Sequence, residues 1–211
     1  MNTISPDKKT TRFLHVYTAR IPDQPNFQEV YPLARNAEIL ATQNKRVRAE
    51  KYYVWKLLEY AVNRSLGVPL SHLSIEKDGN GKWKCARLEF SLSHTDGVVA
   101  VALSQTPVGI DIERADRTVS FAVANKLFNP EEARAYEALP QAEKSPYLLK
   151  KWVQRESAFK KIGGQSFFRE RETTLSTHTW VGQIVIDGKK YLLSVATDDL
   201  ENPKFFNDVI L

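Results

Sequence analysis

The chain has 211 residues, 42% of them hydrophobic, so it can form one large domain or two small ones with a buried core, and its composition argues against intrinsic disorder. The single cysteine, Cys85, excludes an internal disulfide framework, and no Cys/His spacing indicates a structural zinc site. The net charge of +5 favours anionic partners, but the basic residues are dispersed along the chain, so we expect no nucleic acid partner.

The sequence carries no feature of a secreted or membrane protein. Residues 1–12 are polar and lack the apolar core of a signal peptide. No stretch approaches the roughly 18 apolar residues that are needed to span a bilayer. We therefore expect a soluble cytoplasmic protein with no membrane partner.

The first half of the chain predicts an opening strand, one long helix and a run of short strands. Apolar residues at helical spacing, followed by Gly67 and Pro69, predict a helix over residues 36–66. Turn residues at 78–81 and 95–97 indicate reversals of the chain. Strands are expected at residues 13–17, 88–94, 98–104 and 108–113.

The second half has clearer helix signals. Residues 129–132 (Asn-Pro-Glu-Glu) predict an N-cap, a proline at the first helical position and a capping-box glutamate. Residues 145–146 (Ser-Pro) repeat the cap-and-proline signal, and the glycines at 163–164 are expected to end this second helix. A closing hairpin is expected at residues 181–186 and 191–196. Each half thus holds a helix and strands, which predicts an α+β fold with a seam near residues 104–107.

Two acidic residues alternate with two isoleucines in the strand predicted at residues 108–113. Ile110 and Ile112 would enter the core, while Asp111 and Glu113 would point together to the other face. Two carboxylates at this separation repel each other unless a cation lies between them, and magnesium takes oxygen ligands together with water and substrate phosphates. An ordinary half-exposed strand with a polar outer face is the alternative.

Glu156 lies within the apolar stripe of the helix predicted to begin at residue 146. The expected members of this stripe are Leu149, Trp152, Val153 and Phe159. Burying an unpaired charge costs several kcal/mol, so Glu156 must meet a cation, a metal or a water-filled cleft. Lys160 follows one turn later, and a plain (i, i+4) ion pair worth roughly 0.2–0.5 kcal/mol is the alternative.

Three motifs, in this order and at these separations, resemble the 4'-phosphopantetheinyl transferase superfamily, in particular its longer single-chain members of the type that activates surfactin synthetase. Residues 90–95 (FSLSHT) are similar to the family's F-N-x-S-H-S/T, and residues 108–113 (VGIDIE) to its I/V-G-I/V/C-D-I/V-E. Residues 152–160 (WVQRESAFK) are similar to W-x-x-K-E-A/S-x-x-K. The resemblance is thin before Arg46 and after Gly164.

The resemblance implies a fold of two similar α+β halves packed as a pseudo-dimer, with coenzyme A in the cleft between them. On this basis the N-terminal half would be residues 1–104, on the adenosine and phosphate side of coenzyme A. The C-terminal half would be residues 105–211, which carry the metal and catalytic carboxylates. Because one chain supplies both halves, we expect a monomer.

The resemblance also implies the reaction and the roles of individual residues. The enzyme would transfer 4'-phosphopantetheine from coenzyme A to a serine of an apo acyl or peptidyl carrier protein and release 3',5'-adenosine bisphosphate. Glu156 would be the base and Lys160 would steady the departing bisphosphate. The Mg2+ ligands would be Asp111, Glu113 and Glu156, and the residues that bind coenzyme A would be Arg48, Lys82, Ser93, His94 and Lys160.

The chain departs from the family pattern at four places. Trp83 follows Gly-Lys where relatives often have proline, Arg155 replaces a lysine, and Ser91 replaces an asparagine. The basic residues at the start of the first helix align loosely, so Arg46 is an alternative to Arg48.

Two other functions remain open from the sequence. Another Mg2+-dependent phosphoryl enzyme, such as a phosphatase or a nuclease, would use the same carboxylates. A non-catalytic homologue would only bind coenzyme A or a carrier protein. The sequence does not identify the carrier, because residues 121–136, which we expect to face it, contain no motif that distinguishes one class of carrier from another.

Overall fold

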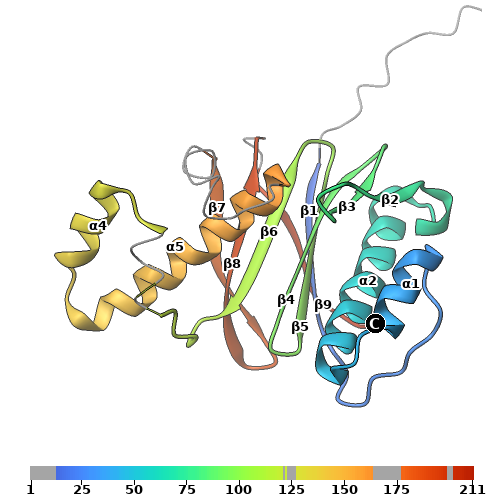
Figure 1. Cartoon of the computed structure of the whole chain (residues 1–211), viewed down its shortest axis with the longest axis horizontal. Helices are drawn as coiled ribbons and strands as arrows, with labels where there is room; N and C mark the ends of the chain where they lie inside the picture. The colour runs from blue at the N-terminus through green and yellow to red at the C-terminus, as the bar shows by residue number, and fades with distance from the viewer. Residues whose placement is uncertain (1–12, 121, 123–126, 164–176, 199–201) are drawn as a thin grey trace, which may run out of the picture.

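The computed structural model describes residues 13–120, 122, 127–163, 177–198 and 202–211. In this part of the chain, two β-sheets share one hydrophobic core, and each sheet carries a long helix on its outer face (Figure 1). The α+β class predicted from the sequence is confirmed, whereas the pseudo-dimer stays a prediction. No helix within these ranges is both long and apolar enough to cross a membrane.

The first sheet has four strands in the order β4-β5-β1-β9. Neighbouring strands are antiparallel except β1 and β9, which run parallel. Both faces of β5 are buried, which explains why its sequence is a continuous apolar run. The strands are β1 (Leu14–Arg20), β4 (Glu89–Thr95), β5 (Val98–Ser104) and β9 (Lys204–Val209).

The single long helix predicted for the first half is wrong at its start, because α1 (Leu33–Leu40) and α2 (Lys45–Leu66) are separate helices. Asn44 precedes α2, and its side chain accepts a hydrogen bond from the backbone N–H of Val47 at 3.1 Å. An asparagine at this position satisfies one of the free amides of a helix start, so it favours a new helix here. Gly67 ends α2 in a left-handed conformation, as predicted.

A small hairpin lies outside the two sheets. Its strands are β2 (Ile75–Lys77) and β3 (Trp83–Cys85), which follow a short 3-10 helix, Leu70–His72. The turn predicted at residues 78–81 joins them. The ring of Trp83 packs edge-on against Trp55 of α2, with 5.2 Å between ring centroids, and this contact fixes the hairpin to the first core.

The second sheet has three antiparallel strands in the order β6-β8-β7. They are β6 (Val108–Arg114), β7 (Thr179–Ile186) and β8 (Lys189–Thr197). Asp187 and Gly188 form the turn between β7 and β8 with positive φ angles, which confirms the closing hairpin. One face of this sheet and one face of the first sheet fill the shared core, to which β6 contributes Ile110 and Ile112.

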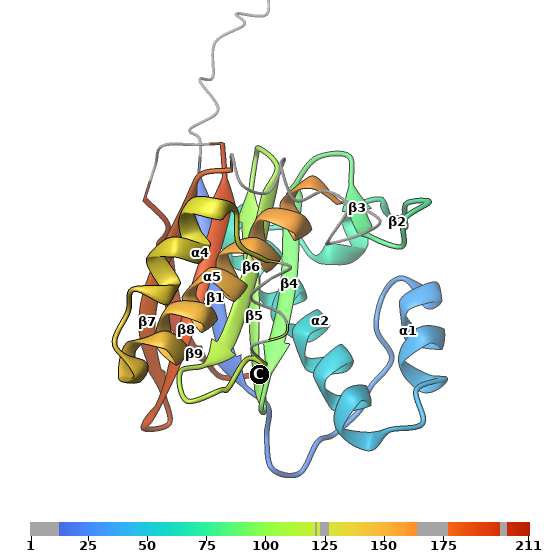
Figure 2. The same ribbon diagram turned by 60° about the vertical axis from the view of Figure 1, so that its left-hand side comes forward.

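One long helix lies on the outer face of the second sheet, and a shorter helix packs against it. The capping box predicted at residues 129–132 is present and begins α4 (Pro130–Glu137). α5 (Gln141–Ile162) begins five residues before the predicted start at Pro146, which lies inside the helix. A proline in the second turn removes one backbone hydrogen bond without ending a helix. Figure 2 shows α5 crossing the outer face of β6 and β8, with α4 beside it.

Gly109 lets α5 lie close against β6. A β-carbon built at this position would be 1.8 Å from the backbone oxygen of Ser157 and 2.5 Å from the backbone nitrogen of Lys161. No side chain can occupy that space unless the helix moves. The glycine in the motif at residues 108–113 therefore sets the distance between the strand and the helix that carry the predicted acidic residues.

The two sheets meet where β4 runs beside β6, and serine side chains make the link. The Oγ of Ser91 accepts a hydrogen bond from the backbone N–H of Ile110 at 3.1 Å, and the Oγ of Ser93 accepts one from Ile112 at 3.3 Å. Ser91 therefore hydrogen-bonds the backbone of β6 from the position where the family has asparagine. The seam joins residues from both sides of the expected division.

The expected division into residues 1–104 and 105–211 stays a prediction. β9 follows the division point in the sequence but pairs with β1 in the first sheet. Its Phe206 stacks on Tyr17 with 4.5 Å between ring centroids. The end of the chain thus returns to the sheet in which the described part begins.

Candidate active site

Asp111 lies where α5, β6 and β4 meet, and it is only 4% exposed. Its Oδ1 accepts a hydrogen bond from the Oγ of Ser93 at 2.9 Å and forms an ion pair with the Nζ of Lys160 at 2.7 Å. Its Oδ2 is buried and has no hydrogen-bond partner among the described residues. The two oxygens of one carboxylate are thus in different environments, since one is fully engaged and the other is left for a further cation or donor.

Glu113 is buried on the same face of β6 as Asp111. It accepts a hydrogen bond from the Oγ1 of Thr95 at 3.0 Å and forms an ion pair with Arg117. The prediction that the two acids share one face while the isoleucines enter the core is confirmed. Because both acids are buried and paired with cations, the alternative of an ordinary half-exposed strand face is wrong.

Glu156 lies on α5 and is half-buried. Burial raises the pKa of its carboxyl above the ordinary value, Lys160 and Arg117 act to lower that pKa, and Asp111 acts to raise it. Glu156 is therefore close enough to interact electrostatically with members of both ion pairs of the site, Asp111–Lys160 and Glu113–Arg117. This agrees with the expectation that Glu156 is not an ordinary solvated residue.

The buried face of α5 is more polar than the predicted stripe. Leu149 and Val153 are buried as expected, but Trp152 and Phe159 are partly exposed. The buried residues of the helix are Leu148, Leu149, Val153, Arg155, Ser157 and Ala158. Hydrophobic periodicity overlooks Arg155 and Ser157, because Arg155 pairs with Glu132 of another helix and Ser157 hydrogen-bonds Ser194 as well as the backbone of its own helix.

Arg155 holds α5 to α4. Its Nη2 donates hydrogen bonds to both carboxylate oxygens of Glu132, at 2.8 Å and 3.1 Å. Lys151 also donates to Glu132, at 2.9 Å. The same glutamate closes the capping box of α4, so the residue next to Glu156 is fixed to the first turn of another helix.

The three predicted metal ligands lie in one region, but the structure holds two of them in ion pairs. Among the described residues, no three His, Cys, Asp or Glu side chains are close enough together to hold a metal ion. The residues nevertheless fit a magnesium ion in one respect, because the partnerless Oδ2 of Asp111 is a buried carboxylate oxygen, the donor that this ion prefers.

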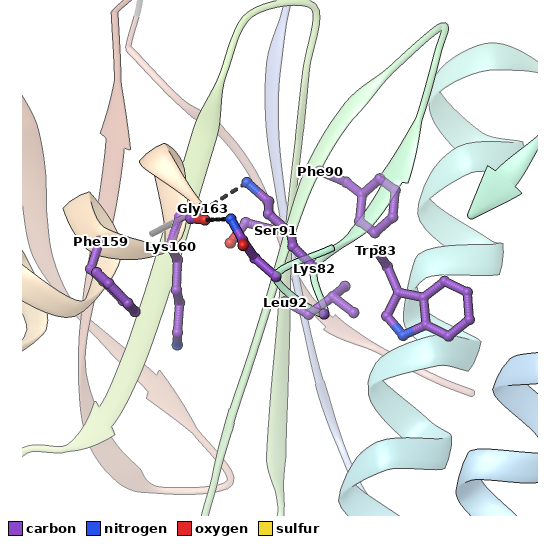
Figure 3. Close-up of a pocket in the computed structure, with 10 residues that line it drawn as sticks. Lys82, Trp83, Phe90, Ser91, Leu92, Phe159, Lys160 and Gly163 are labelled. Carbon is purple, nitrogen blue, oxygen red and sulfur yellow. Dashed lines mark hydrogen bonds between the residues drawn. The ribbon is translucent and has the colours of Figure 1, made fainter. Parts of the chain in front are cut away.

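A pocket of about 290 Å³ opens beside Lys160, between β4, the β2–β3 turn and the end of α5 (Figure 3). Trp83, Phe90 and Leu92 contribute apolar walls from the first half of the chain, and Phe159 contributes one from α5. The indole N–H of Trp83 is buried and has no hydrogen-bond partner in the described part of the chain. The lining of the pocket thus combines apolar side chains with Lys160, whose ammonium group pairs with Asp111.

Lys82 lines this pocket, but its ammonium group is engaged. The Nζ donates to the backbone oxygen of Lys160 at 2.8 Å (Figure 3). It also lies 3.4 Å from the backbone oxygen of Lys161. Burial lowers the pKa of Lys82 below its ordinary value. The structure therefore places Lys82 at the predicted cleft, with its charge directed at the end of α5.

His94 lies on the opposite face of β4 from Ser93. Its Nδ1 is 3.3 Å from a carboxylate oxygen of the buried Glu50 of α2. The pKa of His94 is below its ordinary value, mainly through burial, although Glu50 acts to raise it and Lys160 acts to lower it. His94 and Glu113 both line a second pocket, of about 560 Å³.

The structure brings Arg46, but not Arg48, to this second pocket. Arg46 pairs with Glu50 at 3.0 Å and with Asp96 at 2.9 Å. Arg48 donates instead to the backbone oxygen of Thr42 at 2.8 Å, in the connection between α1 and α2. Arg46, the alternative left open by the sequence, is therefore the better-placed arginine.

Sequence reasoning missed three partners of the predicted site residues. Thr95 closes the motif at residues 90–95, and its position two residues after Ser93 puts it on the same face of the strand. Arg117 lies four residues after Glu113 and Glu50 lies four residues after Arg46, but no local pattern singles them out. Their roles depend on which strand ends and helices meet.

Comparison with known proteins identifies relatives of this chain. The model of the 4'-phosphopantetheinyl transferase superfamily matches residues 107–201. The 4'-phosphopantetheinyl transferase psf-1 of Bacillus pumilus is 27% identical over 110 residues, which are 51% of this chain and 47% of that protein. The 4'-phosphopantetheinyl transferase gsp of Aneurinibacillus migulanus is 30% identical over 99 residues, which are 46% of this chain and 41% of that protein.

In these matches the chain spans less than half the length of each of the two relatives. The segment matched to the family contains β6 and α5, which carry the acidic residues and Lys160. The arrangement of these residues and the family match point the same way: residues 107–201 are similar to the 4'-phosphopantetheinyl transferase superfamily.

Proposed function

We propose that this protein transfers the 4'-phosphopantetheine group of coenzyme A to a serine of an apo acyl or peptidyl carrier protein, in a Mg2+-dependent reaction. The serine oxygen forms a bond to the β-phosphorus of coenzyme A, and the bond from that phosphorus to the adenosine bisphosphate breaks. The proton of the serine passes to a base, and the electron pair leaves with 3',5'-adenosine bisphosphate. The names of the two relatives and the family match support this chemistry.

The observation that carries the proposal is the environment of Asp111. Its Oδ1 is held by Ser93 and Lys160, and its buried Oδ2 lacks a partner among the described residues. A carboxylate held in this way is prepared to receive a cation at a fixed position. We propose that Asp111, Glu113 and Glu156 hold Mg2+, whose chemistry is to neutralise charge on the pyrophosphate oxygens.

Glu156 is the proposed base. A serine hydroxyl is a poor nucleophile at neutral pH, so a group near it must take its proton as the new bond forms. Burial raises the pKa of Glu156, which makes its carboxylate a stronger base than an exposed glutamate. Lys160 lies one turn further along α5 and would steady the negative charge of the departing bisphosphate.

Coenzyme A is proposed to bind across the seam between β4 and β6, where both pockets lie. His94 and Arg46 line the larger pocket and offer donors to phosphate groups. Lys160 and the aromatic residues line the smaller pocket.

One chain supplies both sides of this seam, which supports a monomer made of two α+β halves. Residues 121 and 123–126 of the expected carrier-facing loop lie outside the described residues.

The test is the release of 3',5'-adenosine bisphosphate from coenzyme A, measured with and without apo carrier proteins. We expect release only when Mg2+ and an apo carrier are both present, because the carrier supplies the nucleophile. Release without a carrier would instead identify a phosphoryl hydrolase. Binding of coenzyme A without release for any carrier would identify a non-catalytic homologue.

Glu156→Gln separates catalysis from binding. Removing a general base costs about 10²–10⁴ in rate, while coenzyme A binding should be largely kept. Glu59→Gln is the matched control, because Glu59 is a partly buried acid on α2 that pairs with Lys56, away from the seam. Equal transfer rates for the two variants would overturn the role given to Glu156.

A further inference from the structure

The last turn of α5 is held by a turn from the other half of the chain. The final carbonyl groups of a helix have no partner within the helix. Here Lys82 donates to the carbonyl oxygen of Lys160 at 2.8 Å, and the side-chain nitrogen of Asn80 donates to that of Gly163 at 3.0 Å. Both donors come from the turn between β2 and β3. A cation at this end of a helix also favours the helix dipole.

This turn is ordered before it reaches α5. The Oδ1 of Asp78 accepts hydrogen bonds from the backbone N–H groups of Asn80 and Lys82, both at 2.9 Å. The backbone N–H of Asp78 donates to the carbonyl oxygen of Lys82 at 2.8 Å. The backbone positions of the two donors are therefore fixed by one aspartate, and their side chains reach α5 from a rigid base.

Lys160 takes part in both sets of contacts. Its backbone oxygen accepts from Lys82, while its Nζ lies 3.0 Å from the Oγ of Ser93 and 2.7 Å from Asp111. Gly163 ends the helix at a left-handed φ of 66°, and a β-carbon there would be 3.3 Å from the Cδ of Lys82. The turn and the helix end thus fit closely, and a shift of the last turn would move the Lys160 side chain.

We propose that Lys82 and Asn80 are positioning residues, which clamp the last turn of α5 so that Lys160 reaches Ser93 and Asp111. The clamp gives Lys82 a role other than the cofactor binding expected from the sequence, because its ammonium group is directed at carbonyl oxygens. The effect of the clamp on the reaction rests on the proposed transferase function. The existence of the clamp does not rest on that function, because the order of the last turn of α5 can be measured in the protein without substrates.

The test compares Lys82→Met and Asn80→Leu with wild type, and Lys189→Met serves as the charge-matched control. Lys189 is an exposed lysine in the hairpin between β7 and β8. If the clamp positions Lys160, both clamp variants lower kcat for transfer by about 10- to 100-fold, as expected for a small displacement of a catalytic group. The KM and Kd for coenzyme A stay within about threefold of wild type. Lys82→Arg, which can still donate to both carbonyls, recovers most of the rate.

A second readout does not depend on activity. We expect backbone amides of residues 160–163 to exchange hydrogen about tenfold faster in Lys82→Met and Asn80→Leu, and at the wild-type rate in Lys189→Met. A weakened affinity for coenzyme A, with kcat and exchange unchanged, would show that Lys82 binds the substrate directly and would overturn the clamp. If wild type transfers nothing to any carrier, the proposed function fails, and unchanged exchange in the variants would still refute the clamp.

Discussion

At the scale of single residues, the site depends on acids that are buried together with their counter-charges. Asp111 pairs with Lys160, Glu113 pairs with Arg117, and Glu156 lies among these groups with a raised pKa. Such an arrangement is costly for folding, because carboxylates lose water that their partners only partly replace. We infer that function, and not stability, accounts for Glu156.

This inference predicts an effect of Glu156→Gln on stability. The pKa of Glu156 in the folded state is raised above the ordinary value of 4.5, which we take for the unfolded chain. Ionisation of this carboxyl at higher pH therefore lowers the free energy of unfolding. Glutamine carries no charge at any pH. Without divalent metal, Glu156→Gln should therefore be more stable than wild type at pH 8, and the difference should vanish near pH 4. Urea unfolding of both proteins at both pH values measures this difference in stability. If the variant were less stable than wild type at pH 8, the predicted direction of the effect would be wrong.

At the scale of elements, the close approach of α5 to β6 depends on Gly109. A methyl group at this position would overlap backbone atoms of α5, which cannot rotate away as a side chain can. Gly109→Ala should lower the free energy of unfolding by about 3 kcal/mol. It should also lower transfer activity in the protein that remains folded, since Lys160 and Asp111 lie on the two elements that are pushed apart.

Gly79→Ala is the matched control for this prediction. Gly79 lies in the β2–β3 turn, and a β-carbon there meets no atom within 4 Å. Chemical denaturation of both variants provides the measurement. Equal stabilities would mean that the helix moves away from the strand at no cost, which would contradict the close packing of α5 on β6.

The contact between α4 and α5 depends on Glu132. Glu132→Gln keeps the size of the side chain and can keep the capping box, but it removes the counter-charge of the buried Arg155. We expect a loss of about 2–3 kcal/mol in unfolding free energy, because one partner of a largely buried ion pair is neutralised. Glu131→Gln, an exposed neighbour in the same helical turn, should cost about 0.5 kcal/mol or less. Similar losses in both variants would show that Arg155 does not depend on Glu132.

The sequence predicts most elements where local chemistry decides them. The capping box before Pro130, the glycine that ends α2 and the turn at Asp187 are all in place. The break between α1 and α2 was missed because the apolar repeat that predicts the helix lies at residues 54–61, well after Asn44, whose side chain caps the start of α2. β9 was missed because its pairing with β1 joins distant parts of the chain and leaves no local signal.

At the scale of the whole molecule, the site exists only because two sheets meet along one seam. The acids on β6 could be identified from their alternation with isoleucines, but their partners could not. Ser93, Thr95 and Lys160 reach Asp111 and Glu113 from another strand and from a helix. Tertiary contacts of this kind decide which acids are paired, and they are not encoded in any single segment.

The most direct test of the proposed function is the intact mass of an apo carrier protein after incubation with this protein, coenzyme A and Mg2+. A panel of fatty-acid, polyketide and non-ribosomal-peptide carriers covers the classes that the sequence leaves open. We predict that at least one carrier gains the mass of one phosphopantetheine group, and that its serine-to-alanine variant gains none. An unchanged mass for every carrier in the panel would contradict the proposed transfer.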